Sequence, residues 1–224
     1  MEKNSSIRDL KLLGNQITNC KNCPRLAEYI RNVAKTKVKR FADQEYWGKP
    51  LSGFGDPNAR LLIVGLAPAA HGGNRTGRMF TGDSSGDWVA RALYHNGFAT
   101  KPTSEHKNDG FALKDAYITA VVRCAPPQNK PTKEEFDACS DFLKQELMIL
   151  KNIKVVVCLG RISFERCCKL LQIKNKEFSH GKIFEHERFI VICSYHPSRQ
   201  NTQTKRLGWT AWNRIFEDAR RILD

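Results

Sequence analysis

Four short apolar runs, alternating with helix-like segments, limit the possible folds of this chain more than any other feature. The runs are rich in β-branched residues and occupy residues 60–66, 116–123, 155–160 and 189–194. Each run is nearly continuous, which is typical of strands whose two faces are both covered. Patterns typical of helices occupy residues 86–96, 132–152, 161–173 and 204–223. This alternation predicts an α/β fold in which helices sandwich a parallel sheet.

The length of the chain favours one domain, because 224 residues suit a single sizeable α/β core better than two. Its first 50 residues are predicted to form a helix and then a loop with the basic run "KTKVKR", and residues 182–189 are predicted to add a strand and a tight turn. No apolar run is long enough to span a membrane, and the first residues do not resemble a signal peptide. We therefore expect a cytoplasmic protein.

The charge of the chain indicates a class of partner. It carries 37 Lys and Arg against 23 Asp and Glu, a formal net charge of +14. Such an excess attracts polyanions, because neutralised phosphates release their condensed counterions. The alternative is a basic surface that only faces water. Charge thus favours nucleic acid without predicting an activity.

Three polar loops are predicted to build the functional site. In open α/β sheets, functional residues gather in the loops at the carboxyl ends of the parallel strands. Here these loops read "APAAHGGNRTGRMFTGD", "CAPPQNKPT", "GRIS" and "YHPSRQNTQTKR". All but the short "GRIS" loop are rich in polar residues that a core does not need, so we expect the site between these three.

The eight cysteines divide into two sets. Four of them lie in apolar strands or on a helical segment and are predicted to be small core residues, namely Cys158, Cys167, Cys168 and Cys193. The other four form a C-x2-C pair and a C-x14-C pair, namely Cys20, Cys23, Cys124 and Cys139. Four thiolates suit structural zinc or an iron–sulfur cluster, and the spacing alone does not decide between the two. The alternative is two unrelated pairs of core cysteines.

Together, these motifs resemble family 5 uracil-DNA glycosylases, the iron–sulfur members of the uracil-DNA glycosylase superfamily. The resemblance rests on "GLAPAAHGGNRTGRMFTGD" followed by "SSGDW", on "RCAPPQNKPT" and "HPSRQNTQTKRL", and on the order and spacing of the four cysteines. It implies one glycosylase domain over residues 1–224, with a three-layer α/β/α fold and a central parallel four-stranded sheet. It also implies a [4Fe–4S] cluster on the quartet and excision of damaged bases from DNA. One departure is Lys205, where we expect Gly.

A base glycosylase extrudes the nucleotide from the stack and reads the base in a pocket. Phe80 is the expected stacking surface, although it could instead anchor its loop in the core. Asn129 offers both a donor and an acceptor to a uracil edge, and Thr132 is the better candidate to cap the following helix. His196 could donate to uracil O2 as negative charge builds up on the leaving base. Its alternative is a structural histidine.

The exit of the first strand carries no acid, although related families place an acid or amide near the position of Ala67. The nearest carboxylate is Asp83, which could stabilise the cationic sugar or could simply cap the next helix. His71 and Asn74 are second candidates for placing water. The backbone amides of Leu66, Ala67 and Ala69 are expected to add contacts to the base.

Basic and amide side chains of the loops are expected to contact DNA. After the last strand these are Arg199, Gln200, Asn201, Lys205 and Arg206, which suit phosphates and a wedge that fills the gap left by the flipped base. In the first loop, Arg75 and Arg78 are expected to hold phosphates beside the lesion. The glycines at positions 72, 73 and 77 would let the backbone approach the strand.

The favoured function is hydrolytic excision of uracil, and of other damaged bases such as hypoxanthine, from double-stranded DNA without lyase activity. One alternative is a metal-dependent phosphodiesterase that uses Asp83, Asp87 and His196. Another is a non-catalytic nucleic-acid-binding module on a four-cysteine metal site. We expect a monomer, with a sliding clamp as a candidate protein partner.

Overall fold

The computed structural model describes residues 2–174 and 176–224 and contains one six-stranded sheet, in the order β1-β3-β2-β4-β6-β5. Its four central strands are parallel: β2 (Leu61–Gly65), β3 (Ala116–Ala120), β4 (Val155–Leu159) and β6 (Ile190–Ser194). These are the four apolar runs of the sequence. All residues of β2, β3 and β4 are buried, as expected for strands covered on both faces.

Two short antiparallel strands complete the edges of the sheet. One is β1 (Phe54–Gly55), which pairs with β3, and the other is β5 (Ile183–Glu185), which pairs with β6. The strand predicted within residues 182–189 is therefore present as β5, whereas β1 has no counterpart among the predicted elements. The parallel four-stranded sheet is confirmed as the centre of a larger mixed sheet.

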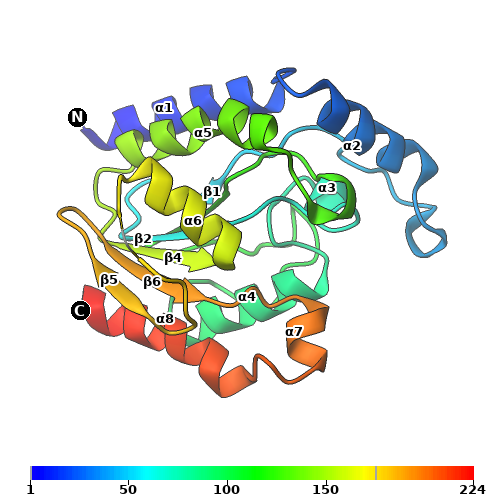
Figure 1. Ribbon diagram of the computed structural model, residues 1–224. Coiled ribbons are helices and arrows are strands. Elements are labelled where there is room, and N and C mark those ends of the chain that lie inside the picture. Colours follow the sequence, from blue (N-terminus) through cyan, green and yellow to red (C-terminus); the bar gives the residue numbers. More distant parts are fainter. Residues whose placement is uncertain (1, 175) are drawn as a thin grey trace.

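Helices cover both faces of the sheet, so the three-layer architecture is confirmed (Figure 1). One face packs against α5 (Lys133–Ile149) and α6 (Arg161–Leu170), with side chains such as Phe136, Leu143 and Phe164. The other face packs against α4 (Ser84–His95) and α8 (Trp209–Leu223), where Trp212 and Phe216 are buried.

The N-terminal segment adds two helices to the face of α5. The first, α1 (Glu2–Thr18), was not predicted from the sequence and buries Leu13 and Ile17, while α2 (Pro24–Thr36) buries Leu26 and Ile30. An ion pair of 2.7 Å between Arg25 and Glu135 links α2 to α5. None of the described helices has both the length and the apolar character needed to cross a bilayer.

Short helices shape the loops at the carboxyl ends of the parallel strands. The loop after β2 contains α3 (Gly73–Thr76), and the loop after β3 contains the 3-10 helix η2 (Pro127–Asn129). The loop after β6 contains α7 (Arg199–Gln203). All three loops lie at one edge of the sheet, because the strands before them run in the same direction.

Candidate active site

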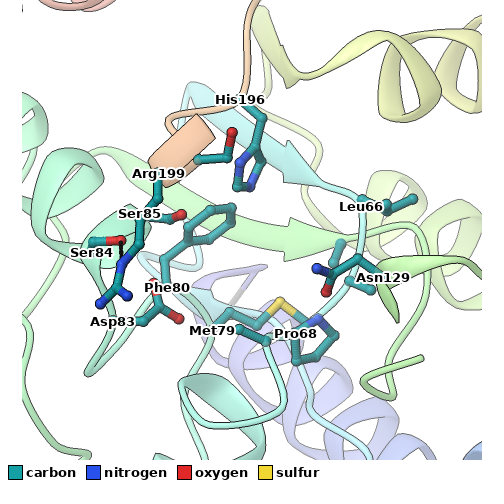
Figure 2. Close-up of a pocket in the computed structure, with 14 residues that line it drawn as sticks. Leu66, Pro68, Met79, Phe80, Asp83, Ser84, Ser85, Asn129, His196 and Arg199 are labelled. Atoms are coloured by element: carbon teal, nitrogen blue, oxygen red, sulfur yellow. Dashed lines mark hydrogen bonds between the residues drawn. The ribbon is translucent and has the colours of Figure 1, made fainter. Parts of the chain in front are cut away.

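A pocket of about 430 Å³ lies where the loops after β2, β3 and β6 meet, as the sequence predicts. Figure 2 shows the ring of Phe80 near its centre, with His196 on one side and Asn129 across the pocket from Asp83 and Arg199. The lining is Leu66, Ala67, Pro68, Ala69, Met79, Phe80, Asp83, Ser84, Ser85, Ala120, Asn129, His196, Ser198 and Arg199. The pocket thus collects most of the predicted catalytic and base-reading residues from three separate loops.

Phe80 is held against the end of β2 by the absence of a side chain at Gly65. A Cβ at Gly65 would lie 2.8 Å from Cζ of Phe80, so only glycine lets the ring lie over this strand exit. The ring centroid of Phe80 is 5.9 Å from that of His196, with 33° between the planes. Phe80 is part of the pocket wall and only partly buried, which leaves ring surface for a planar base.

Asp83 both caps α4 and lines the pocket, so the two predicted roles coexist in one position. Its Oδ1 accepts a hydrogen bond of 2.9 Å from the backbone N–H of Gly86. Its Oδ2 is packed against Gly72, where any Cβ would overlap the carboxylate. Burial raises the pKa of Asp83, while backbone amides and the charges of Arg75 and Arg199 act in the opposite direction. The carboxylate is thus partly desolvated yet held in place.

His196 presents a neutral imidazole to the pocket. Burial lowers the pKa of His196 from the ordinary 6.5 to about 4, so the ring is uncharged at neutral pH. Asn201 Nδ2 donates a hydrogen bond of 2.8 Å to the carbonyl oxygen of His196, which fixes the backbone of this loop. A Cβ built on Gly160 would lie 3.6 Å from Cβ of His196, so the turn after β4 also supports the histidine.

Asn129 offers a free amide at the opposite wall. Its φ of 57° lies in the left-handed region, which asparagine tolerates better than most residues. Within the described residues, its side chain makes no hydrogen bond, whereas Thr132 caps α5 in a capping box with Glu135. The cap is therefore supplied by Thr132, and the Asn129 amide is available to a ligand.

The strand exit supplies small and backbone groups rather than an acid. Ala67 and Ala69 line the pocket, as predicted. The structure does not bring His71 and Asn74 to it. His71 Nδ1 lies 3.1 Å from the Tyr46 hydroxyl, and Asn74 is fully buried with its amide donating to the carbonyl of Ile30.

The predicted DNA-contacting residues after β6 have different environments. Arg199 is exposed, lines the pocket and donates from Nε to the Ser84 hydroxyl over 3.3 Å. Gln200 is exposed on α7, and Arg206 is exposed with its guanidinium carbon 4.6 Å from the ring centroid of Tyr195. Asn201, in contrast, uses its side chain to hold the His196 carbonyl.

Two arginines of the first loop are interior, contrary to the expectation that they face phosphates. Arg78 is 7% exposed and donates to Asp109, Ser104, Thr81 and two backbone carbonyls. Arg75 is 9% exposed and donates to His71, Gln44 and Gly82. All donors of Arg78 are directed inward because its partners from residues 104–111 surround it, so it braces the loop.

Six pocket residues were not singled out from the sequence, namely Pro68, Met79, Ser84, Ser85, Ala120 and Ser198. Met79 contributes an apolar wall, and Ser84 receives the Arg199 hydrogen bond. Ser85 donates from Oγ to the carbonyl of Pro197 over 3.1 Å and so joins the loops after β2 and β6. The only sequence signal for the serines was their place at a helix start, which also fits plain capping.

The four cysteines of the predicted ligand quartet converge between α2, the loop after β3 and α5. Burial, followed by the neighbouring Cys139, raises the pKa of Cys23 to about 11. Burial, followed by the neighbouring Cys139, Cys23 and Cys20, raises the pKa of Cys124. Burial raises the pKa of Cys139, against a hydrogen bond from the Arg123 backbone amide. The neighbouring thiols thus act on the pKa values of Cys23, Cys124 and Cys139, and a shared cationic group would remove this repulsion.

Four thiolates are a donor set that suits a structural zinc ion or an iron–sulfur cluster. Within the described residues, no three His, Cys, Asp or Glu side chains are close enough to hold one metal ion. In the same part of the chain, Asp83, Asp87 and His196, the residues of the metal-dependent phosphodiesterase alternative, are not found as such a group.

Comparisons with known proteins agree with this geometry. The family described as "Uracil DNA glycosylase superfamily" matches residues 52–220. A type-5 uracil-DNA glycosylase of Pyrobaculum aerophilum is 45% identical over 193 residues, which cover 86% of this chain and 84% of that protein. The type-5 enzyme of Mycobacterium leprae is 43% identical over 215 residues, covering 94% of each.

A type-4 uracil-DNA glycosylase of Archaeoglobus fulgidus is more distant, at 31% identity over 153 residues, 65% of this chain and 69% of that protein. The resemblance drawn from the loop motifs is thus confirmed. Because the matched region spans the sheet and all three loops of the pocket, the chain belongs to the uracil DNA glycosylase superfamily.

Proposed function

We propose that this protein hydrolyses the N-glycosidic bond of uracil in DNA and leaves an abasic site, as a step of base excision repair. The observation that carries the proposal is one pocket in which Phe80, Asn129, His196 and Asp83 face a common space. The printed names of the similar proteins, uracil-DNA glycosylases of types 5 and 4, support it.

Base recognition falls to the ring and the amide at opposite sides of the pocket. Uracil stacks on Phe80, and the free Asn129 amide pairs with its N3–H and O4. A base inside the duplex stack cannot reach this pocket, so the nucleotide must be extruded before it is read. The interior arginines of the same loop brace the backbone and side chains beside Phe80, through Thr81 and Gly82, rather than touching the base.

Neutral His196 is suited to assist the leaving group. Cleavage leaves negative charge on the pyrimidine ring, and a preplaced N–H donor toward O2 stabilises this charge as it forms. Because burial lowers the pKa of His196, the ring is uncharged at neutral pH and needs no counterion in the pocket. The Asn201 bond to the His196 carbonyl holds the donor in position.

The Asp83 carboxylate is suited to the sugar. Glycosidic cleavage passes through an oxocarbenium-like state, whose positive charge a nearby carboxylate stabilises, and the same group can orient the attacking water. The cap bond from Gly86 occupies one oxygen and leaves the other facing Gly72 and the pocket. No lysine is among the described pocket-lining residues, which supports simple hydrolysis without a Schiff base.

We extend the proposal to double-stranded DNA and to further deaminated bases such as hypoxanthine. The pocket volume of about 430 Å³ leaves room beyond a pyrimidine ring. The absence of an acid at Ala67 removes one polar group that would select among base edges. The predictions of a monomer, a cytoplasmic location and a sliding-clamp partner stay predictions.

We further propose a [4Fe–4S] cluster on Cys20, Cys23, Cys124 and Cys139. When bound, it would supply four iron–thiolate bonds that tie the N-terminal segment to the loop after β3 and to α5. None of the four cysteines lines the base pocket, so a structural role is the one that their placement supports. A brown protein with broad visible absorbance is expected, and a colourless protein with zinc would contradict the cluster.

The test of the main proposal uses duplex oligonucleotides with a single uracil, hypoxanthine or unmodified base. Incubation in EDTA followed by alkali is expected to cut the uracil strand at the abasic site. Without alkali the strand should stay intact. Cutting without alkali that depends on added divalent ions would instead support the phosphodiesterase alternative.

A further inference from the structure

The basic run "KTKVKR" ends at a groove that adjoins the base pocket. This run leads from the last turn of α2 into the 3-10 helix η1 (Lys39–Phe41), and Arg40 and Phe41 line a second cavity of about 550 Å³. Asp83, Ser84 and Arg199 line both this groove and the base pocket. Figure 1 shows the loop after α2 projecting on the same side of the molecule as α7.

Arg40 is held by stacking rather than by an ion pair. Its guanidinium carbon lies 4.2 Å from the ring centroid of Phe41, and that of Arg75 lies 3.9 Å from the same ring. Arg75 is buried and bonded to the loop after β2 through His71 and Gly82. The ring of Phe41 therefore fixes an exposed arginine onto the loop that carries Phe80 and Asp83.

The donors of Arg40 are free to bind an anion. Within the described residues, its guanidinium makes no hydrogen bond and no ion pair, although it is exposed and restricted by the ring. Burial and then the charges of Arg40 and Arg75 lower the pKa of His71, so the surroundings of Arg40 are positive. A planar guanidinium with free N–H groups matches the oxygens of a phosphate.

Within the described residues, no acid of the groove forms an ion pair with Arg40. Asp87 and Glu105 also line this cavity. Burial, then Asp83 and Glu105, raise the pKa of Asp87, which groups these three carboxylates together. An anion is therefore attracted to the Arg40 part of the groove and repelled from the acidic part.

We propose that Arg40, stacked on Phe41, binds a backbone phosphate of the DNA strand that carries the target base. The inference rests on the proposed function, since the groove continues from the base pocket through Asp83 and Ser84. The loop after α2 and α7 then form two walls of one path for the strand, with Arg40 on one wall and Arg199 on the other. The partner is DNA rather than a protein or a free anion, because a nucleotide in the base pocket places its own phosphates at the mouth of this groove.

Salt-dependent binding tests the assignment in the full-length protein. The probes are an unmodified duplex and a duplex with 2′-fluoro-2′-deoxyuridine, which resists cleavage. Arg40→Ala is expected to weaken both complexes and to reduce the slope of log affinity against log salt by about one. KM for a uracil duplex should rise, while the single-turnover rate at saturating enzyme stays at the wild-type value.

Two further variants separate charge and stacking from general basicity. Lys35→Ala removes an equal charge from the exposed end of the same run, outside the groove, and is expected to change the slope much less. Phe41→Leu keeps the charge of Arg40 but removes the aromatic ring on which its guanidinium stacks. DNA affinity should therefore fall, while the slope of log affinity against log salt is retained. Thermal unfolding checks that Phe41→Leu is folded, and if it is not, the comparison of Arg40→Ala with Lys35→Ala decides.

The outcomes distinguish this inference from the proposed function. If Arg40→Ala keeps the wild-type slope, or loses no more than Lys35→Ala, the Arg40 assignment is overturned even though uracil is excised. If the wild-type protein releases no uracil, the proposed function fails. The slopes on the unmodified duplex then still decide whether Arg40 binds a phosphate.

Discussion

The Asp83 carboxylate occupies the space in which a side chain of Gly72 would begin, so these two residues fit together only while position 72 is glycine. Gly72→Ala should therefore displace Asp83 from the pocket wall. We expect uracil release in single-turnover assays to fall at least about tenfold, since small displacements of a positioned group are costly. Gly14→Ala is the matched control, because its Cβ would meet only ordinary contacts with Ser52. A Gly72→Ala enzyme with the wild-type rate would show that Asp83 has room to move.

Asp83→Asn separates helix capping from catalysis. An asparagine keeps a side-chain oxygen for the Gly86 N–H but removes the negative charge, and both residues are good N-caps. We expect a loss of at most about 1 kcal/mol in the free energy of unfolding and a loss of at least about a hundredfold in the single-turnover rate. Asp83→Ala removes both the cap oxygen and the charge, so it should lower both the free energy of unfolding and the single-turnover rate. Wild-type rates in Asp83→Asn would leave Asp83 as a cap only.

The centre of the fold could be predicted because parallel buried strands read as continuous apolar runs. Of the two edge strands, β5 was predicted within residues 182–189, whereas β1 has only two residues, which is too short for a periodic pattern. α1 was missed because its sequence is polar and its buried face becomes apparent only when it packs beside α5. Tertiary packing, rather than local propensity, decides such segments.

Site residues were predictable where chemistry and loop position agreed. His196, Asn129, Phe80 and Asp83 all reach the pocket from strand-end loops. Arg78 could not be assigned correctly, since an arginine in a glycine-rich loop suggests phosphate until its distant partner Asp109 is known. Lys205, which replaces an expected glycine, has a φ of 59°, so the backbone keeps the glycine-like conformation despite the side chain.

Arg78→Ala tests the bracing role of this arginine. The ion pair with Asp109 is almost fully buried, at 8% and 2% side-chain exposure, and removing one partner leaves a buried charge. We expect the free energy of unfolding to fall by about 3–5 kcal/mol. Arg214→Ala, at an exposed pair with Asp218, should cost less than about 1 kcal/mol. Near-native stability of Arg78→Ala, with a reduced salt slope for DNA binding, would restore the phosphate-binding interpretation.

Substitutions in the predicted ligand quartet should change the visible spectrum, whereas substitutions of the core cysteines should not. Cys20→Ala and Cys124→Ala remove ligands of the proposed cluster, so we expect lower folded yield, less bound iron and loss of the broad visible absorbance. Cys168→Ala truncates a buried thiol outside the quartet and should keep iron and colour. Full iron content in Cys124→Ala would remove this residue from the ligand set.

Stability should depend on pH through His196. The unfolded chain protonates this histidine as the pH falls below 6.5, whereas the folded protein keeps it neutral down to about 4. The unfolded state binds more protons in this window, so the stabilisation present above pH 6.5 is lost as the pH falls toward 4, by up to about 3 kcal/mol. Denaturant unfolding at pH 7 and pH 4.5 measures this change.

In His196→Gln the difference in the free energy of unfolding between the two pH values should shrink by most of that amount, because glutamine does not titrate. His106→Gln, at an exposed position, should leave this difference unchanged. Equal pH dependence in the His196→Gln and wild-type proteins would mean that burial does not lower the pKa of His196, and the assignment of a neutral donor held by burial would then be wrong.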